Sequence, residues 1–110
     1  MHSIMPSGTD SPGKPQKLSK ADLKAFQKAH PRWICSSEAL HRTLRFSTYM
    51  DGIAFVQKVA ELADKADHHP DLIVKWHEVE VDLTSHDVGG ITRRDTQLAA
   101  RIEELSHQFT

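Results

Sequence analysis

Two runs of alternating apolar residues in the segment Leu72–Thr84 constrain the fold of this chain more than any other feature. The first run falls on even positions and the second on odd positions: Leu72, Val74 and Trp76, then Val79, Val81 and Leu83. A two-residue turn at His77–Glu78 would pair 76 with 79, 74 with 81 and 72 with 83, which places all six side chains on one face. His and Glu are unfavourable residues for a tight two-residue turn, so a bulge or a longer loop remains an alternative. The segment therefore predicts a β-hairpin with one apolar face.

An earlier extended segment, Trp33–Phe46, shows the same alternation. Leu40, Leu44 and Phe46 share one face, while His41, Thr43 and Arg45 share the other. Arg42 also falls on the apolar face, where a cation is out of place. We expect its guanidinium to reach solvent or a ligand from the end of the strand.

Three segments have the spacing of amphipathic helices. The first begins at the capping box Ser19–Asp22 and ends before His30–Pro31, the second runs from about Thr48 to Asp67, and the third begins at the capping box Thr92–Asp95. Their apolar stripes are Leu23, Phe26 and Ala29; then Tyr49, Ile53, Val56, Ala60 and Ala63, broadened by Phe55, Val59 and Leu62; and finally Leu98, Ile102, Leu105 and Phe109. Each stripe predicts a helix that is buried on one side.

These elements follow one another in the order helix, strand, strand, helix, strand, strand, helix. An antiparallel sheet with one apolar face needs helices to cover that face. We therefore predict an α+β fold, a four-stranded antiparallel sheet with three helices packed on one face, in the order αββαββα. The other face of the sheet would meet solvent and would carry His41, Thr43, Arg45, Glu80 and Asp82.

Composition bounds the class of protein. The chain has 110 residues, which is enough for one domain. We place this domain at residues 18–110. Residues 1–17 are rich in Pro and Gly, and we expect them to form a disordered tail. The net charge of -1 and the mean hydropathy of -0.50 make no case for direct binding to nucleic acid or to a membrane. The first residues lack the apolar core of a signal peptide, so we expect a cytoplasmic location. The single Cys35 allows no internal disulfide.

Histidine is the residue that points to chemistry, with eight copies in the chain. His68, His69 and Pro70 directly follow the second predicted helix, and His86 follows the hairpin, shortly before Gly89–Gly90. Imidazole transfers protons near neutral pH, so three imidazoles at element ends suggest one solvated pocket for acid–base catalysis. In the alternative interpretation, His69 and Pro70 simply end the helix. The remaining histidines have ordinary explanations at helix ends, turns or the surface: His2, His30, His41, His77 and His107.

A metal centre is another interpretation of these side chains. His68, His69, His86 and a nearby Asp are plausible ligand types. Adjacent histidines often point apart, however, and the sequence has no His-x-x-x-His pattern and no cysteine beside them. We therefore expect no metal and no other cofactor.

Beyond single motifs, the residues resemble a known family. The similarity runs from about Leu18 to Leu105. It rests on Asp64, His68-His69-Pro70, Trp76, Val79, Leu83, Ser85-His86-Asp87, Gly89-Gly90, Thr92, Asp95 and Leu98-Ala99. This pattern is similar to that of the pterin-4a-carbinolamine dehydratases. Two positions depart from it conservatively, because Asp64 stands where the family commonly has Glu and Trp76 stands where Tyr is common.

The resemblance implies a hydro-lyase that removes water from 4a-hydroxytetrahydropterin to give the quinonoid dihydropterin, in tetrahydrobiopterin recycling. It implies that His68 and His86 carry the acid and base roles, and that His69 helps to bind and orient the pterin ring. These are the three catalytic residues that the resemblance predicts.

Four further residues would bind substrate or support the site. Asp64 lies one helical turn before His68 and would hold the tautomer of that imidazole. Asp95 would add charge or accept a pterin N–H, or serve only as the acid of a capping box. Pro70 belongs to the motif, and Trp76 would lie at the edge of the pocket unless it is simply part of the core.

The family also implies partners other than the small pterin substrate. Its members form dimers or tetramers, and a sheet that continues across subunits would use an exposed edge strand, so we expect a homodimer or homotetramer. Animal members also act as dimerisation cofactors for a homeodomain transcription factor, and some relatives serve in protein assembly. A non-catalytic binding, dimerisation or assembly module is therefore the alternative function. The presence of all three histidines and of Asp95 favours catalysis.

Overall fold

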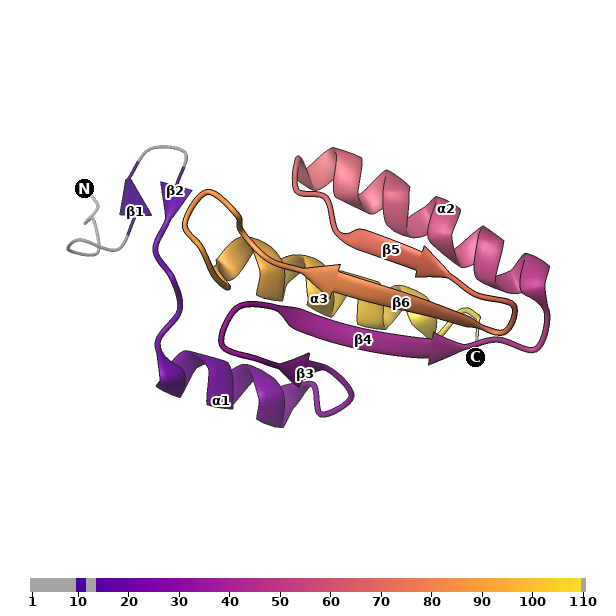
Figure 1. The fold of residues 1–110 in the computed structure, drawn as a ribbon, viewed down its shortest axis with the longest axis horizontal. Coiled ribbons are helices and arrows are strands. Elements are labelled where there is room, and N and C mark those ends of the chain that lie inside the picture. The colour runs from indigo at the N-terminus through magenta and orange to yellow at the C-terminus, as the bar shows by residue number, and fades with distance from the viewer. Residues whose placement is uncertain (1–9, 12–13, 110) are drawn as a thin grey trace.

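The structure is a computed structural model that describes residues 10–11 and 14–109, and within them the chain forms a four-stranded sheet, a two-stranded pair and three helices (Figure 1). The strands are β1 Asp10–Ser11, β2 Lys14–Pro15, β3 Ile34–Cys35, β4 Leu40–Arg45, β5 Asp71–Val74 and β6 Glu78–Leu83; the helices are α1 Lys20–Ala29, α2 Tyr49–Ala66 and α3 Arg93–Ser106. From α1 onward the order is αββαββα, so the predicted α+β fold is confirmed. Of the tail predicted to be disordered, residues 1–9 and 12–13 lie outside the described residues.

The antiparallel sheet has the strand order β3-β4-β6-β5. Leu40 opposes Leu83 and Leu44 opposes Val79, so the central strands present apolar side chains on one face. Helices α2 and α3 pack together over this face, and α1 lies beside β3 (Figure 1). The buried core consists of Trp33, Leu40, Leu44, Phe46, Phe55, Val59, Ala63, Val79, Val81, Leu83, Ile91, Leu98, Ala99 and Ile102. No helix in the described ranges is long and apolar enough to cross a membrane.

Local sequence signals set the helix ends. Both predicted capping boxes are present, Ser19–Asp22 at α1 and Thr92–Asp95 at α3. At the end of α2, Asp67 adopts a left-handed conformation with φ 52°. The next residue, His68, donates its backbone N–H to the carbonyl of Ala63 at 3.1 Å. The chain therefore turns sharply at Asp67 and holds His68 against the end of α2.

The predicted hairpin forms, but its predicted turn at His77–Glu78 is wrong. The observed pairs are Asp71 with Asp82, Leu72 with Val81, Ile73 with Glu80, and Val74 with Val79. A longer loop connects the strands, in which the Lys75 N–H donates to the carbonyl of Glu78 at 2.8 Å and Trp76 lies outside β5. The pairing differs from the predicted one by two residues, and an even shift keeps the strand side chains on their predicted faces. The longer loop avoids a tight turn for which His77 and Glu78 are unsuited.

The face of α2 that meets the sheet is rotated from the predicted one. Its buried residues are Gly52, Phe55, Val59 and Ala63, whereas Tyr49 and Ala60 are exposed. Gly52 lies on the buried side of α2, where a Cβ would be in ordinary contact with Val79, 3.5 Å from its Cγ2. Helix α2 therefore packs on the sheet through the side that carries its one glycine. The predicted stripe followed the larger apolar residues and did not include this glycine.

Arg42 is buried, contrary to the expectation that it reaches solvent or a ligand. Its Nε donates to Oε1 of Glu103 at 2.8 Å and its Nη2 donates to Oε2 at 3.2 Å, while Trp33 Nε1 donates to the same Oε1 at 3.0 Å. Burial alone would raise the pKa of the Glu103 carboxyl, but the hydrogen bonds and charge of Arg42 outweigh burial and leave the pKa below its ordinary value. An ion pair between β4 and α3 therefore satisfies the cation on the apolar face.

Replacing Glu103 by Gln removes the charge that balances the buried Arg42. We predict that Glu103→Gln lowers the free energy of unfolding at pH 7 by about 3 kcal/mol, because an uncompensated buried charge remains. The pKa of Glu103 is lowered by folding, so its stabilisation is present above the unfolded-state pKa and is lost as the pH falls through the folded-state pKa. Urea denaturation at several pH values between 7 and 3 measures both effects. Below pH 5 the wild type should approach the variant in stability; a constant difference down to pH 3 would contradict the assignment.

Candidate active site

The end of α2 and the start of α3 bring one predicted catalytic histidine against a carboxylate. Nε2 of His68 lies 2.5 Å from Oδ1 of Asp95, and the two side chains are 10% and 0% exposed. His68 reaches this position because the chain turns at Asp67, while Asp95 lies in the first turn of α3. Two residues that are distant in the sequence thus form one buried pair.

The other carboxylate oxygen of Asp95 is hydrogen-bonded as well. Oδ2 accepts from the hydroxyl of Ser85 at 2.9 Å and from the backbone N–H of Thr92 at 2.9 Å, and the hydroxyls of Ser85 and Thr92 lie 2.9 Å apart. All of these side chains are buried. An ionised carboxylate only accepts hydrogen bonds, so His68 donates from Nε2. This tautomer leaves the lone pair of the neutral imidazole at Nδ1.

Asp64 does not contact His68 as its spacing predicted. Its Oδ1 lies 2.9 Å from Nε2 of His69, and the Asp64 and His69 side chains are 83% and 60% exposed. Helical spacing does not extend to His68, because α2 ends at Ala66 and the chain turns at the next residue. Asp64 therefore contacts His69 at the surface, and the carboxylate that orients His68 is Asp95, which is also the acid of the capping box.

His86 lies in the loop that connects β6 to α3. The Ser85 N–H donates to the carbonyl of Gly90 at 2.9 Å and closes this loop. The imidazole of His86 is exposed and makes no hydrogen bond with the residues that the structure describes. Because the Ser85 hydroxyl bonds to Asp95, the loop is tied to the same carboxylate as His68. His86 therefore directly follows Ser85, a member of the buried hydrogen-bond network, and its own imidazole is exposed to solvent.

Trp76 lies at the other end of the sheet from this network. It occupies the loop between β5 and β6, is 74% exposed, and its ring centroid lies 4.5 Å from that of His77. His68 precedes β5 and Trp76 follows it, so the strand separates them (Figure 1). Pro70 is half-buried just before β5. Within one chain the structure does not bring Trp76 to the predicted pocket.

A hollow of about 260 Å³ lies beside His68. It is lined by the last turn of α2 and by one face of α3: Lys65, Ala66, His68, Arg94, Gln97, Leu98 and Arg101. Its volume is slightly below the roughly 300–1,000 Å³ of typical ligand pockets, which suits a small ligand or part of a larger one. Sequence reasoning did not single out Lys65 or the α3 residues. The spacing of positions 94, 97 and 101 could have identified them as one helix face.

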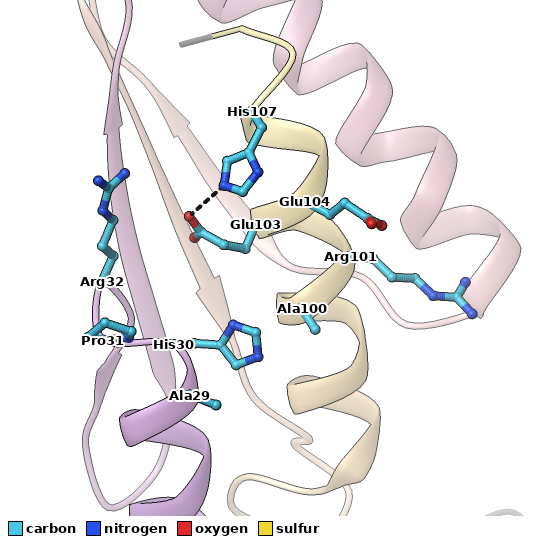
Figure 2. A pocket seen from close by; sticks show the side chains of 9 residues that line it. All are labelled: Ala29, His30, Pro31, Arg32, Ala100, Arg101, Glu103, Glu104 and His107. Carbon is cyan, nitrogen blue, oxygen red and sulfur yellow. Dashed lines mark ion pairs between the residues drawn. The ribbon is translucent and has the colours of Figure 1, made fainter.

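A larger hollow, of about 720 Å³, lies between the end of α1 and α3 (Figure 2). It contains none of the predicted site residues. His30, Glu103 and His107 point into it, but Glu103 is already bonded to Arg42. In the described part of the chain, no three His, Cys, Asp or Glu side chains are arranged to hold a metal ion. The candidate site is therefore the His68–Asp95 pair with its adjoining hollow.

The chain is similar in sequence to one protein family and to several proteins provisionally named as its members. A family model described as pterin 4 alpha carbinolamine dehydratase matches residues 16–105. A protein of Thermosynechococcus vestitus, provisionally named pterin-4-alpha-carbinolamine dehydratase, is 42% identical over 91 residues, which are 83% of this chain and 96% of that protein. A protein of Mycolicibacterium smegmatis with the same provisional name is 43% identical over 88 residues, 80% of this chain and 94% of that protein.

Two solved structures share the fold. A transcriptional coactivator/pterin dehydratase from Brucella melitensis superposes with a TM-score of 0.78 at 25% identity, covering 82% of this chain and 98% of that one. A pterin dehydratase-like protein described as a RuBisCO assembly factor of the alpha-carboxysome superposes with a TM-score of 0.59 at 22% identity, covering 70% and 92%, and shows the fold alone. Because the family model spans most of the chain, this protein belongs to the pterin 4 alpha carbinolamine dehydratase family.

Proposed function

We propose that this protein removes water from 4a-hydroxytetrahydropterin by histidine acid–base catalysis. Membership of the family supports a dehydratase activity. The observation that carries the proposal is the buried pair of His68 and Asp95, 2.5 Å apart and beside a hollow. A carboxylate that orients an imidazole is a common arrangement in sites that transfer protons.

The reaction breaks the bond between C4a and the hydroxyl oxygen and forms a double bond between C4a and the neighbouring ring nitrogen. The hydroxyl accepts a proton and leaves as water, while the ring nitrogen loses its proton. The step therefore needs one proton donor and one proton acceptor, and it exchanges no electrons with a cofactor. The product is the quinonoid dihydropterin, the form that tetrahydrobiopterin recycling would consume.

His68 is the proton acceptor in this proposal. Its Nε2 is bonded to Asp95, its Nδ1 takes the ring proton, and the carboxylate stabilises the resulting imidazolium. His86, exposed on its loop, donates a proton to the leaving hydroxyl. His69, in contact with Asp64 at 2.9 Å, helps to bind and orient the ring.

We predict that the purified chain accelerates the loss of water from 4a-hydroxytetrahydropterin without added metal or redox cofactor, because side chains supply and remove both protons. Stopped-flow absorbance follows the disappearance of the 4a-hydroxy compound. Protein carrying His68→Ala is the matched control for non-specific acceleration. Identical traces with and without the wild-type protein would contradict the proposal.

The three histidines should differ in their effects. His68→Ala and His86→Ala should each lower kcat by roughly 10²-fold or more, since each removes one proton-transfer group. His69→Ala should raise KM more than it lowers kcat. His107→Ala, at an exposed histidine beyond the end of α3, is the control and should change neither constant. Circular dichroism checks folding. Equal, small losses from all three would mean that the roles are misassigned, and a fully active His86→Ala would remove the proposed acid.

We further propose that the active form is a homodimer or homotetramer. β5 pairs with β6 on one side only and forms one edge of the sheet, and its side chains Ile73 and Val74 are 46% and 37% exposed. Exposed edge strands readily pair with another chain. Trp76 could then border a pterin pocket only if a second subunit brought it there. Pro70 would act by fixing the direction of the chain between His69 and β5.

A non-catalytic assembly role is the second candidate. Tyr49, Met50 and Trp76 are exposed, and they lie on elements that meet at the end of the sheet far from His68 (Figure 1). One structure of the same fold is described as an assembly factor. The dehydration assay separates the two roles, because a dedicated assembly module would not accelerate the reaction.

A further inference from the structure

The hollow beside His68 has a basic wall. Three of its lining residues are cations, Lys65, Arg94 and Arg101, and none of its lining residues in the described chain is an acid. The whole chain has a net charge of -1, so this positive charge is a local feature and not a general property of the surface. The proposed dehydration step assigns no role to any of these three cations.

Two of these cations have no acidic partner among the residues that the structure describes. Arg94 is held by Asp87, with Nη1 3.1 Å from Oδ1 and Nη2 3.0 Å from Oδ2, and this contact lowers the pKa of the Asp87 carboxyl. Lys65 and Arg101 form no ion pair with any residue in the described ranges. Two uncompensated cations therefore border one small hollow, where they repel each other and attract an anion.

The fold brings these two cations together from separate helices. Lys65 lies in the last turn of α2, Arg101 lies in the middle of α3, and the two helices pack against each other. Figure 2 shows the Arg101 side chain pointing away from His30 and toward α2. Gln97 precedes Arg101 by one helical turn and lines the same hollow, where its amide offers an uncharged donor.

We propose that this hollow receives an anionic side chain of the pterin substrate, a phosphate or a carboxylate, and that Lys65 and Arg101 select for it. The inference rests on the proposed function, since it places the reacting ring at Nδ1 of His68 and the substrate side chain along α3. Ammonium and guanidinium groups bind phosphate and carboxylate oxygens through charge-assisted hydrogen bonds. Ring chemistry and side-chain recognition are then carried out by neighbouring but different residues.

The anionic group is not changed by the reaction, so its binding stabilises substrate and transition state alike. Such uniform binding lowers KM and leaves kcat unchanged. Single exposed ion pairs are weak, and we expect the two cations together to lower KM by about 5- to 10-fold at low salt. Half-molar salt should remove most of this advantage through screening.

The test compares the 4a-hydroxy derivatives of three tetrahydropterins: 6-methyltetrahydropterin with a neutral side chain, tetrahydroneopterin phosphate, and tetrahydrofolate with its glutamate carboxylates. For the wild type, the KM should be lower for the phosphate derivative, for the carboxylate derivative, or for both, than for the neutral 6-methyl derivative. The derivative with the lower KM identifies the anion that the hollow binds. In Lys65→Gln/Arg101→Gln, that KM should rise to the level of the neutral substrate with kcat unchanged. Lys24→Gln/Lys28→Gln, which removes two cations from α1, is the charge-matched control and should keep the wild-type preference.

Equal KM values for all three substrates in the wild type, or a preference that survives in Lys65→Gln/Arg101→Gln, would overturn the inference while leaving the dehydratase intact. If no substrate is turned over, the proposed dehydration fails, and equilibrium binding still tests the hollow. Fluorescence titration with dihydroneopterin, its phosphate and dihydrofolate should then show the same preference for an anionic side chain and its loss in the double variant. Equal affinities for the three ligands would overturn the inference independently of catalysis.

Discussion

The buried carboxylate of Asp95 is the group on which the arrangement of the site depends. A carboxylate with no exposed surface must be fully hydrogen-bonded to keep its charge. Its donors are Nε2 of His68, the hydroxyl of Ser85 and the backbone N–H of Thr92, which come from the end of α2, the loop after β6 and the start of α3. One charge thus joins three parts of the chain that are far apart in sequence. The contacts that orient the proposed catalytic base are the contacts that hold the local fold.

Helix α3 carries a second largely buried carboxylate, Glu103. The partners of Glu103 and Asp95 differ, and this difference gives one carboxylate a structural role and the other a role in the proposed chemistry. Glu103 faces Arg42, a cation that does not lose its proton in proteins, so this pair ties β4 to α3 and has no proton to exchange. Asp95 faces His68, whose imidazole is a side chain that can both accept and donate a proton. Beside that titratable pair, α3 also presents Arg101 to the hollow, so a single helix contributes to the core, to the orientation of the base and to the proposed recognition of substrate.

Features that depend on local spacing could be predicted from the sequence, and features that depend on where an element ends could not. The capping box at Thr92 and the alternation in β4 are local, and both are present. The contact between Asp64 and His68 was expected from helical spacing, but it fails because α2 stops two residues before His68. The partner of Arg42 lies 61 residues away, beyond the reach of any local pattern. The site residues follow the same division, since the motif located His68 and Asp95 but only the packing of α2 against α3 reveals the cations of the hollow.

Asp95 acts on the reaction through His68 in this mechanism, and a double-mutant cycle tests that dependence most directly. The values to measure are kcat/KM for the wild type, His68→Ala, Asp95→Asn and the double variant, with folding checked for each. If the carboxylate works only by orienting and stabilising the imidazole, Asp95→Asn lowers kcat/KM in the presence of His68 and has no further effect in its absence. Losses that multiply in the double variant would show that Asp95 acts independently of His68, and would contradict the mechanism.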